Sequence, residues 1–301
     1  MTSLDLSWHA VHRMIDATRR RPVFAAVWSA RLALFSGGLA IVGILLHRLL
    51  GLPTPILLNV LKVAFAGAAL ALVLGLMGAV QVWFTGRTGA GAATVGLLAS
   101  LLLFAWPAYY YPAMRDLPAI NDVTTDPDAP PPMMALAKLR GPGANPVAYP
   151  GERFAELQAA AYPDLKPFLI PRPADEAFEI AAEAVRQLRY KVVSETPPGE
   201  SFEEPGYIEA VERTFVMGFY DDIVIRVMGD SEASQIDIRS ASRYGTHDLG
   251  QNASRIRTIL AELRKVMDST VPAEANPRNA RSKQKATQQK RGGRGRAGRR
   301  N

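Results

Sequence analysis

The fold of the C-terminal half is decided by residues 221–241, which read DDIVIRVMGDSEASQIDIRSA. In two runs of this stretch, Ile223–Met228 and Gln235–Ala241, apolar residues recur at every second position: Ile223, Ile225 and Val227 in the first run, and Ile236 and Ile238 in the second. Alternation with a period of two is typical of a β-strand that is buried on one face. Between the runs lies Gly229-Asp230-Ser231, a combination that favours a tight turn. The stretch therefore predicts an antiparallel β-hairpin.

The register of this hairpin follows from its apolar positions, because a shift by one residue would turn every apolar side chain away from the core. The expected cross-strand pairs are Val227 with Ile236, Ile225 with Ile238, Arg226 with Asp237, and Val224 with Arg239. We expect Arg226, Asp237 and Arg239 to lie on an open face of the sheet, away from the core.

The neighbouring segments complete an α+β domain over residues 173–268. Strand-like runs at Tyr190–Glu195 and Tyr207–Phe215 precede the hairpin. Helical spacing of apolar residues follows Pro173 and recurs from about Leu249 to Met267, where Asp248 is the expected N-cap residue. Short connections exclude parallel strands. The sequence therefore predicts an antiparallel four-stranded meander sheet with two helices on one face.

Three apolar stretches in residues 23–111 predict an α-helical membrane anchor of three transmembrane helices. Residues 63–84 and 90–111 are each 22 residues without a charge, enough to cross a bilayer core as a helix. The first stretch, Phe24–Leu52, contains Arg31, His47 and Arg48. It crosses if these cations reach the two membrane surfaces. If this first stretch lies only in the membrane interface, the C-terminal domain stays on the cytoplasmic side.

The formal charge changes sign along the chain: +6 over residues 1–111, −8 over 112–271 and +9 over 272–301. This pattern excludes a uniformly basic nucleic-acid-binding protein. Five arginines precede or begin the first span, at positions 13, 19, 20, 21 and 31, whereas the next loop has two cations. The positive-inside rule then predicts a cytoplasmic N-terminus and a periplasmic C-terminal part.

Three further segments flank these parts. Residues 1–22 form a cytoplasmic segment in which Leu4, Trp8, Val11 and Ile15 share one helical face. Residues 112–172 form a Pro-rich linker with a short helix from Glu152 to Tyr162. Residues 269–301 form a disordered basic tail, because they lack the apolar side chains that a core needs.

Several peptides in the C-terminal half resemble one family. They are Thr124–Asp126, Ala161–Asp164, Asp221–Val227, Asp237–Gly245 and Asp248–Asn252. Over roughly residues 118–268 the sequence resembles the domain of unknown function 1499 family. The resemblance implies a bacterial envelope or membrane-attached protein, located here in the inner (plasma) membrane. That family has no established reaction, so the resemblance implies no catalytic residue.

The residue types disfavour an enzyme. The chain has no cysteine, and His247 is the one histidine after residue 47. Asp221 and Asp222 are adjacent, so in a strand they point to opposite faces and cannot share acid–base work. The carboxylates Asp122, Asp126 and Asp128 are explained better as turn formers than as metal ligands. We expect no cofactor and no metal.

The candidate binding residues are mostly basic. Guanidinium groups and the N-terminus of the last helix together suit a carboxylate, a phosphate or a lipid head group. The predicted site comprises Arg226, Asp237, Arg239, Arg243, Asp248 and Asn252. The alternative is internal pairing, Arg226 with Asp237 and Arg243 with Asp248.

Three functions remain open from the sequence. The first is an envelope protein whose domain binds or scaffolds an anionic lipid, a cell-wall polymer or another envelope protein, with the lipid bilayer as its constant partner. The second is a hydrolytic enzyme acting on an envelope component through Asp237, Arg239 and Arg243. The third is a cytoplasm-facing adaptor whose basic tail binds nucleic acid, a role that an outside C-terminus excludes.

Overall fold

The computed structural model describes residues 21–199 and 204–270. The chain forms two compact units. One unit holds the N-terminal helices together with the short segment Thr214–Phe219, and the other holds Leu117–Arg213 and the chain from Tyr220 onward. The helix expected at Leu4–Ile15 and the basic tail after residue 271 lie outside the described residues.

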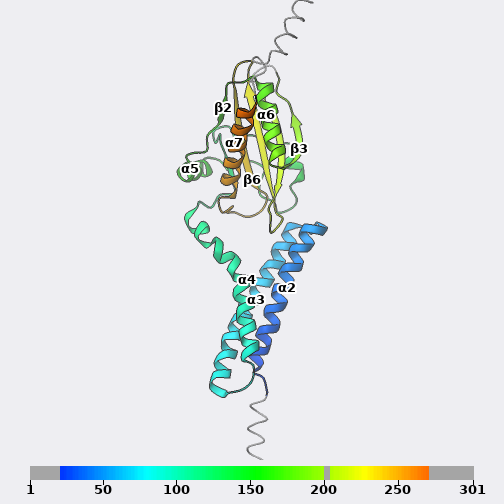
Figure 1. Cartoon of the computed structure of the whole chain (residues 1–301), viewed down its shortest axis with the longest axis vertical. Helices are drawn as coiled ribbons and strands as arrows, with labels where there is room; N and C mark the ends of the chain where they lie inside the picture. Colours follow the sequence, from blue (N-terminus) through cyan, green and yellow to red (C-terminus); the bar gives the residue numbers. More distant parts are fainter. Residues whose placement is uncertain (1–20, 200–203, 271–301) are drawn as a thin grey trace, which may run out of the picture. The chain divides into compact units, whose positions relative to one another are not determined.

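The first unit contains three helices, α2 (Phe24–Leu50), α3 (Thr54–Thr85) and α4 (Ala90–Asp116) (Figure 1). All three are long and apolar enough to cross a membrane, which confirms the three expected helices. Gly51 and Gly86 end α2 and α3 in the left-handed conformation, with φ of 71° and 61°. Glycine suits this conformation because it has no Cβ.

Small side chains bring all three helices together. Ser29 in α2 donates a hydrogen bond from Oγ to the Ala71 carbonyl in α3 at 2.7 Å. A Cβ added at Gly75 in α3 or at Gly96 in α4 would clash with the same serine. These small residues therefore let α2 pack closely against both α3 and α4, as is usual for helices that pack within a bilayer.

The segment Thr214–Phe219 connects the strands Gly206–Arg213 and Tyr220–Gly229 and is called the hairpin tip below. It belongs to the same unit as the helices. Arg48, in the last turn of α2, donates from Nη1 to the Thr214 carbonyl at 3.1 Å. The imidazole Nε2 of His47 lies 3.1 Å from the carbonyl oxygen of Gly218. The two polar side chains at this end of α2 therefore contact backbone carbonyls of the tip.

The second unit is built on an antiparallel sheet of six strands. They are β1 (Asp122–Thr124), β2 (Phe168–Ile170), β3 (Lys191–Thr196), β4 (Gly206–Arg213), β5 (Tyr220–Gly229) and β6 (Ser234–Ser242). The order is β1-β6-β5-β4-β3, and β2 also pairs with β6. The four-stranded meander predicted from the sequence corresponds to β3–β6. The prediction of four strands was wrong because two short strands from the preceding segment add to β6.

The predicted hairpin register is confirmed. The observed pairs include Val227 with Ile236, Ile225 with Ile238, Arg226 with Asp237, and Val224 with Arg239. Residues 229–234 form the turn, where Asp230 accepts hydrogen bonds from the N–H groups of Glu232 (2.8 Å) and Ala233 (3.1 Å). The Gly-Asp-Ser sequence is therefore a turn.

Two helices, α6 (Ala174–Gln187) and α7 (Gln251–Ser269), pack on the sheet and confirm the α+β class (Figure 1). Their apolar residues share one buried cluster with the inward residues of the hairpin. The cluster includes Phe178, Val185, Ile223, Ile225, Ile236, Ile238, Ile256, Ile259 and Leu263. Because α7 begins at Gln251, its N-cap position is Gly250 and not Asp248 as predicted.

The opposite sheet face is covered by the Pro-rich segment. A short helix, η1 (Leu136–Leu139), and the chain around it place Met133 and Leu136 against Val224 and Ala241. The helix α5 (Glu152–Ala161) follows, and the amide of Gln158 exchanges hydrogen bonds of 2.9 and 2.6 Å with the backbone of Thr124. The face predicted to be open is buried, and residues from Leu117 on form part of the domain where the sequence suggested a linker over 112–172.

The strand β2 offers a test of this enlarged domain. Ile170 is 2% exposed and Leu169 is 71% exposed. We expect Ile170→Ala to lower the free energy of unfolding by about 2–5 kcal/mol, because it leaves a cavity. Leu169→Ala should change it by less than about 0.5 kcal/mol. Pulse proteolysis of the full-length protein in urea measures both, and equal effects would place β2 outside the core.

Candidate functional site

The covered face of the sheet carries a buried layer of charged side chains, called the ionic layer below. Its members are Asp122, Arg140, Glu209, Asp222, Arg226, Asp237, Arg239 and Arg243. They come from β1, β4, β5 and β6, from the residue directly after β6 and from the loop after η1. Alternation along the strands places them opposite the apolar cluster under the helices.

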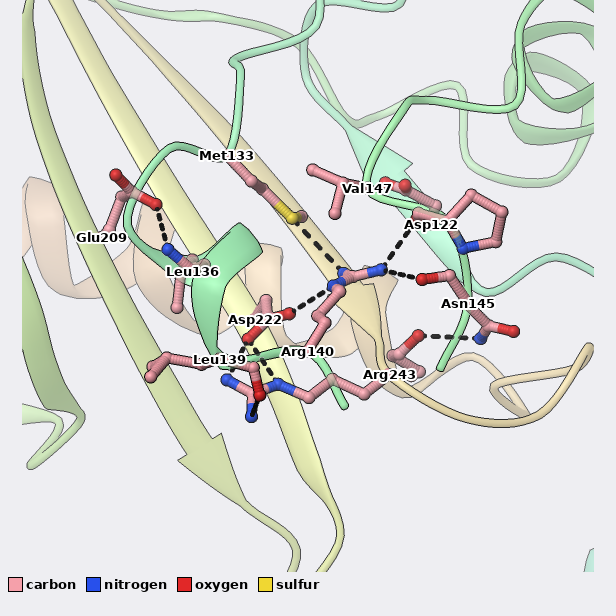
Figure 2. Close-up of polar contacts among 12 residues, drawn as sticks. Asp122, Met133, Leu136, Leu139, Arg140, Asn145, Val147, Glu209, Asp222 and Arg243 are labelled. Atoms are coloured by element: carbon pink, nitrogen blue, oxygen red, sulfur yellow. Dashed lines mark hydrogen bonds and ion pairs between the residues drawn. The ribbon is translucent and has the colours of Figure 1, made fainter. Parts of the chain in front are cut away.

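Asp222 on β5 is the centre of this layer. Its side chain is fully buried and accepts hydrogen bonds from two arginines (Figure 2). Arg140 Nε donates to one carboxylate oxygen at 2.8 Å. Arg243 donates to the other oxygen from Nε at 2.8 Å and from Nη2 at 2.7 Å. One buried negative charge therefore holds two guanidinium groups.

These arginines tie the covering loop to the sheet. Arg140 also donates to the carbonyls of Asn145 (2.8 Å) and Pro146 (2.7 Å), and Arg243 donates to that of Leu139 at 3.2 Å. Figure 2 shows the Arg140 guanidinium enclosed between Met133, Asn145 and Asp222. Carbonyl groups and a carboxylate together satisfy the donors, which a buried guanidinium requires.

Two further arginine–aspartate pairs extend the layer. Arg239 binds Asp122 through two parallel bonds of 3.0 and 2.7 Å and also donates to the carbonyls of Pro131 and Val147. Arg226 donates from Nη2 to Asp237 and to Asp126, each at 2.7 Å. Both guanidinium groups therefore use their donors within the domain, as planar bidentate pairing favours.

Glu209 on β4 has a different environment. Its buried carboxylate accepts hydrogen bonds from the N–H groups of Met134 (3.0 Å), Ala135 (2.9 Å) and Leu136 (2.8 Å). Figure 2 shows its bond to Leu136. Three backbone donors at the start of a helical turn stabilise a negative charge without a cation. Glu209 thus fixes η1 over the sheet.

The helix-facing side has one charged cluster of its own. Arg255 on α7 donates to Asp221 at 2.6 Å and contacts the Glu212 carboxylate. Asn252 accepts hydrogen bonds from Ser240 Oγ (2.8 Å) and Arg255 Nη1 (2.7 Å). Asp221 and Asp222 therefore serve opposite faces, as adjacent strand residues must.

Asp248 stabilises the start of α7. Its carboxylate accepts the N–H groups of Gly250 at 2.8 Å and Asn252 at 2.9 Å. The predicted pair of Arg243 with Asp248 is wrong, because Arg243 binds Asp222. The predicted pair of Arg226 with Asp237 is confirmed.

Burial shifts the acid–base properties of this region. It raises the pKa of Asp122 and of Asp237, while the bonds from Arg239 and Arg226 oppose that shift. Burial raises the pKa of Tyr149, whose ring lies under Arg239, to about 12. The aspartates therefore depend on their arginines to remain charged, and Tyr149 stays protonated at neutral pH.

The structure brings four of the six predicted binding residues into one layer: Arg226, Asp237, Arg239 and Arg243. None of these four is more than 9% exposed, and their partners are internal. Asp248 and Asn252 lie at the start of α7. Within residues 21–199 and 204–270, no group of three His, Cys, Asp or Glu side chains is placed to hold a metal ion.

Sequence reasoning missed Asp122, Arg140, Glu209 and Arg255 as partners. The alternation in 221–227 does place Asp222 on the face of Arg226. The other positions carried no local signal, because their charged partners lie 34 to 117 residues away. Packing of the Pro-rich segment onto the sheet brings Asp122, Arg140 and Glu209 to their partners, and packing of α7 does so for Arg255.

The sequence of this domain matches a known protein family. Residues 122–263 match the family model described as a protein of unknown function, DUF1499. These residues form a DUF1499 domain. The match begins at Asp122 in β1 and ends within α7, so it includes the whole ionic layer of the DUF1499 domain. No curated protein is significantly similar to the chain.

We expect Asp222→Asn to destabilise the DUF1499 domain by about 3–5 kcal/mol, because two buried guanidinium groups lose their counter-charge. The matched control is Asp164→Asn, which breaks the exposed pair with Arg257 and should cost less than about 1 kcal/mol. Pulse proteolysis in urea of the full-length protein measures both changes. Tryptophan fluorescence would not report unfolding of the domain, because all four tryptophans precede it. A small effect of Asp222→Asn would show that the layer is not structural.

Glu209→Gln tests the backbone-binding carboxylate separately. The amide keeps one acceptor oxygen and loses the charge, so the free energy of unfolding should fall by about 1–3 kcal/mol. Amide hydrogen exchange should accelerate first at Met134–Leu136. Unchanged exchange there would contradict the assigned role.

Proposed function

We propose that this protein is an integral membrane protein whose DUF1499 domain is a non-enzymatic binding or scaffolding module on the outer face of the bacterial inner membrane. The observation that carries this proposal is the internal pairing of the ionic layer. Its arginines and aspartates bind one another and the covering loop. Charges used in this way fix one conformation of a domain.

The connection to the membrane helices supports the same function. Five residues separate the end of α4 at Asp116 from the start of β1 at Asp122. Such a short connection tethers the domain near the bilayer whichever side it occupies. A tethered, rigid domain suits partners at that surface, such as an anionic lipid, a cell-wall polymer or another envelope protein.

The charge distribution supports the outer side. Three crossings place the two ends of the anchor on opposite sides, and the five arginines before or within the start of α2 favour a cytoplasmic N-terminus. On the outer side the basic C-terminal tail meets no nucleic acid, and anionic lipid or cell-wall polymer is its counterpart.

A topology experiment tests this proposal. We expect a reporter enzyme that is active only outside the cytoplasm to be active when fused after Asp268. The same reporter fused after Arg87, between α3 and α4, should be silent and serves as the matched control. Protease added to spheroplasts should remove the domain. A silent Asp268 fusion with a protected domain would contradict the proposal and favour the adaptor with a nucleic-acid-binding tail.

A further inference from the structure

A second polar region of the DUF1499 domain borders the ionic layer, where the guanidinium of Arg243 lies 5.5 Å from the ring centre of Tyr220. A pocket of about 460 Å³, open to solvent, is lined by Leu188, Arg189, Tyr190, Lys191, Val211, Glu212, Arg213 and Tyr220. These residues come from the end of α6, the start of β3, the end of β4 and the start of β5. The volume is in the range of small-ligand sites.

The pocket is electropositive. It holds three cations and one carboxylate, and that carboxylate, Glu212, is already bound by Arg255. Arg189 and Lys191 are exposed and form no ion pair with the described residues. Their charges are therefore available to an anion from solution.

Arg189 occupies a backbone position that suits glycine. Its φ is +58°, in the left-handed region, directly after α6. The N–H of Arg189 bonds to the Arg186 carbonyl at 3.0 Å and that of Tyr190 to the Val185 carbonyl at 3.2 Å, a Schellman motif. The equivalent positions after α2 and α3 are glycines. Arginine is less favourable than glycine in this backbone conformation, and its side chain adds a cation to the lining of the pocket.

The remaining donors are held in place by their neighbours. The guanidinium of Arg213 lies 5.3 Å from the ring centre of Tyr220, its cross-strand partner. Burial, with a smaller contribution from Glu212, raises the pKa of Tyr190 to about 12, so its hydroxyl remains a donor at neutral pH. A positioned cation and a protonated phenol suit the oxygens of a phosphate.

The chain beside the pocket points to a membrane ligand. Arg213 and Tyr220 directly flank the hairpin tip, whose sequence is TFVMGF. Phe215 in the tip is 90% exposed. The tip contacts the end of α2, a span-capable helix, and so belongs at the level of the membrane interface. Exposed apolar side chains next to cations are typical of segments that enter an anionic lipid surface.

We propose that the pocket between α6, β3 and the β4–β5 hairpin binds the phosphate of an anionic phospholipid head group. Arg189, Lys191 and Arg213 bind the phosphate oxygens, and the hairpin tip enters the adjacent acyl region. The inference uses the membrane attachment of the domain and does not depend on which side of the membrane the domain occupies.

The test uses the full-length protein in a non-ionic detergent. We expect it to bind dihexanoyl phosphatidylglycerol in microscale thermophoresis. Dihexanoyl phosphatidylcholine, which has no net charge, should bind at least about tenfold more weakly. Added salt should weaken the phosphatidylglycerol interaction, because the site is exposed.

Variants assign this binding to the pocket. Arg189→Gly and Lys191→Gln should each reduce the affinity for phosphatidylglycerol by about tenfold or more, through loss of charge-assisted hydrogen bonds. Arg189→Gly should leave the thermal midpoint of the protein unchanged or higher, since glycine suits the left-handed position. Lys166→Gln removes an exposed lysine outside the pocket and should bind as the wild type does.

Each other outcome contradicts the proposal. Wild-type affinity in Arg189→Gly and Lys191→Gln would mean that the lipid binds elsewhere, for example along the helices. A lower thermal midpoint with unchanged lipid affinity would mean that Arg189 serves only the end of α6. If glycerol phosphate or inorganic phosphate binds as tightly as the lipid, and Phe215→Ser changes nothing, the ligand is a soluble phosphate. Because all measurements use purified protein, a failed topology experiment leaves them unaffected.

Discussion

The DUF1499 domain depends on the carboxylate of Asp222. This one buried negative charge, between Arg140 and Arg243, joins the central strand β5 to the edge of β6 and to the loop after η1. The alternative partner for a buried guanidinium is water, which the covering segment excludes. The polar face of the sheet is therefore buried only when the Pro-rich segment is in place. The charges bind that segment to the sheet, together with the pairing of β1 and the apolar contacts of Met133 and Leu136.

The two faces of the sheet are consequently stabilised by different kinds of contact. Under α6 and α7, apart from the cluster around Arg255, the contacts are apolar and non-directional, so any well-filled packing of similar volume would satisfy them. Under η1, arginine forks, carboxylates and backbone carbonyls meet at defined distances, and a small shift would leave several donors unsatisfied. A domain with one adaptable and one exacting face keeps a fixed surface, as the proposed binding or scaffolding role requires.

The same logic separates the ionic layer from the pocket at the end of α6. In the layer, guanidinium groups are buried and already bound. In the pocket, Arg189 and Lys191 are exposed to solvent. Arg189 also has a left-handed backbone conformation, which is unfavourable for a residue with a Cβ. Charges that a protein neutralises internally build its structure, whereas charges left exposed in a concave site are available to a ligand.

The sequence by itself determined the three span-capable helices, the hairpin 221–241 and its register, the two covering helices and the family. The structural predictions rest on local periods and the absence of charges, and the family rests on short peptides, all of which can be read without knowledge of the fold. The sequence did not determine the fate of residues 117–150, since prolines report an extended chain but not what it packs against. Only the tertiary structure placed Asp122, Arg140 and Glu209, because their partners lie tens of residues away and no local pattern encodes a contact at that separation. The tertiary structure therefore showed that the face expected to be open is a buried layer. It also placed Arg189, Lys191 and Arg213 around one pocket, because the end of α6 lies next to the β4–β5 connection.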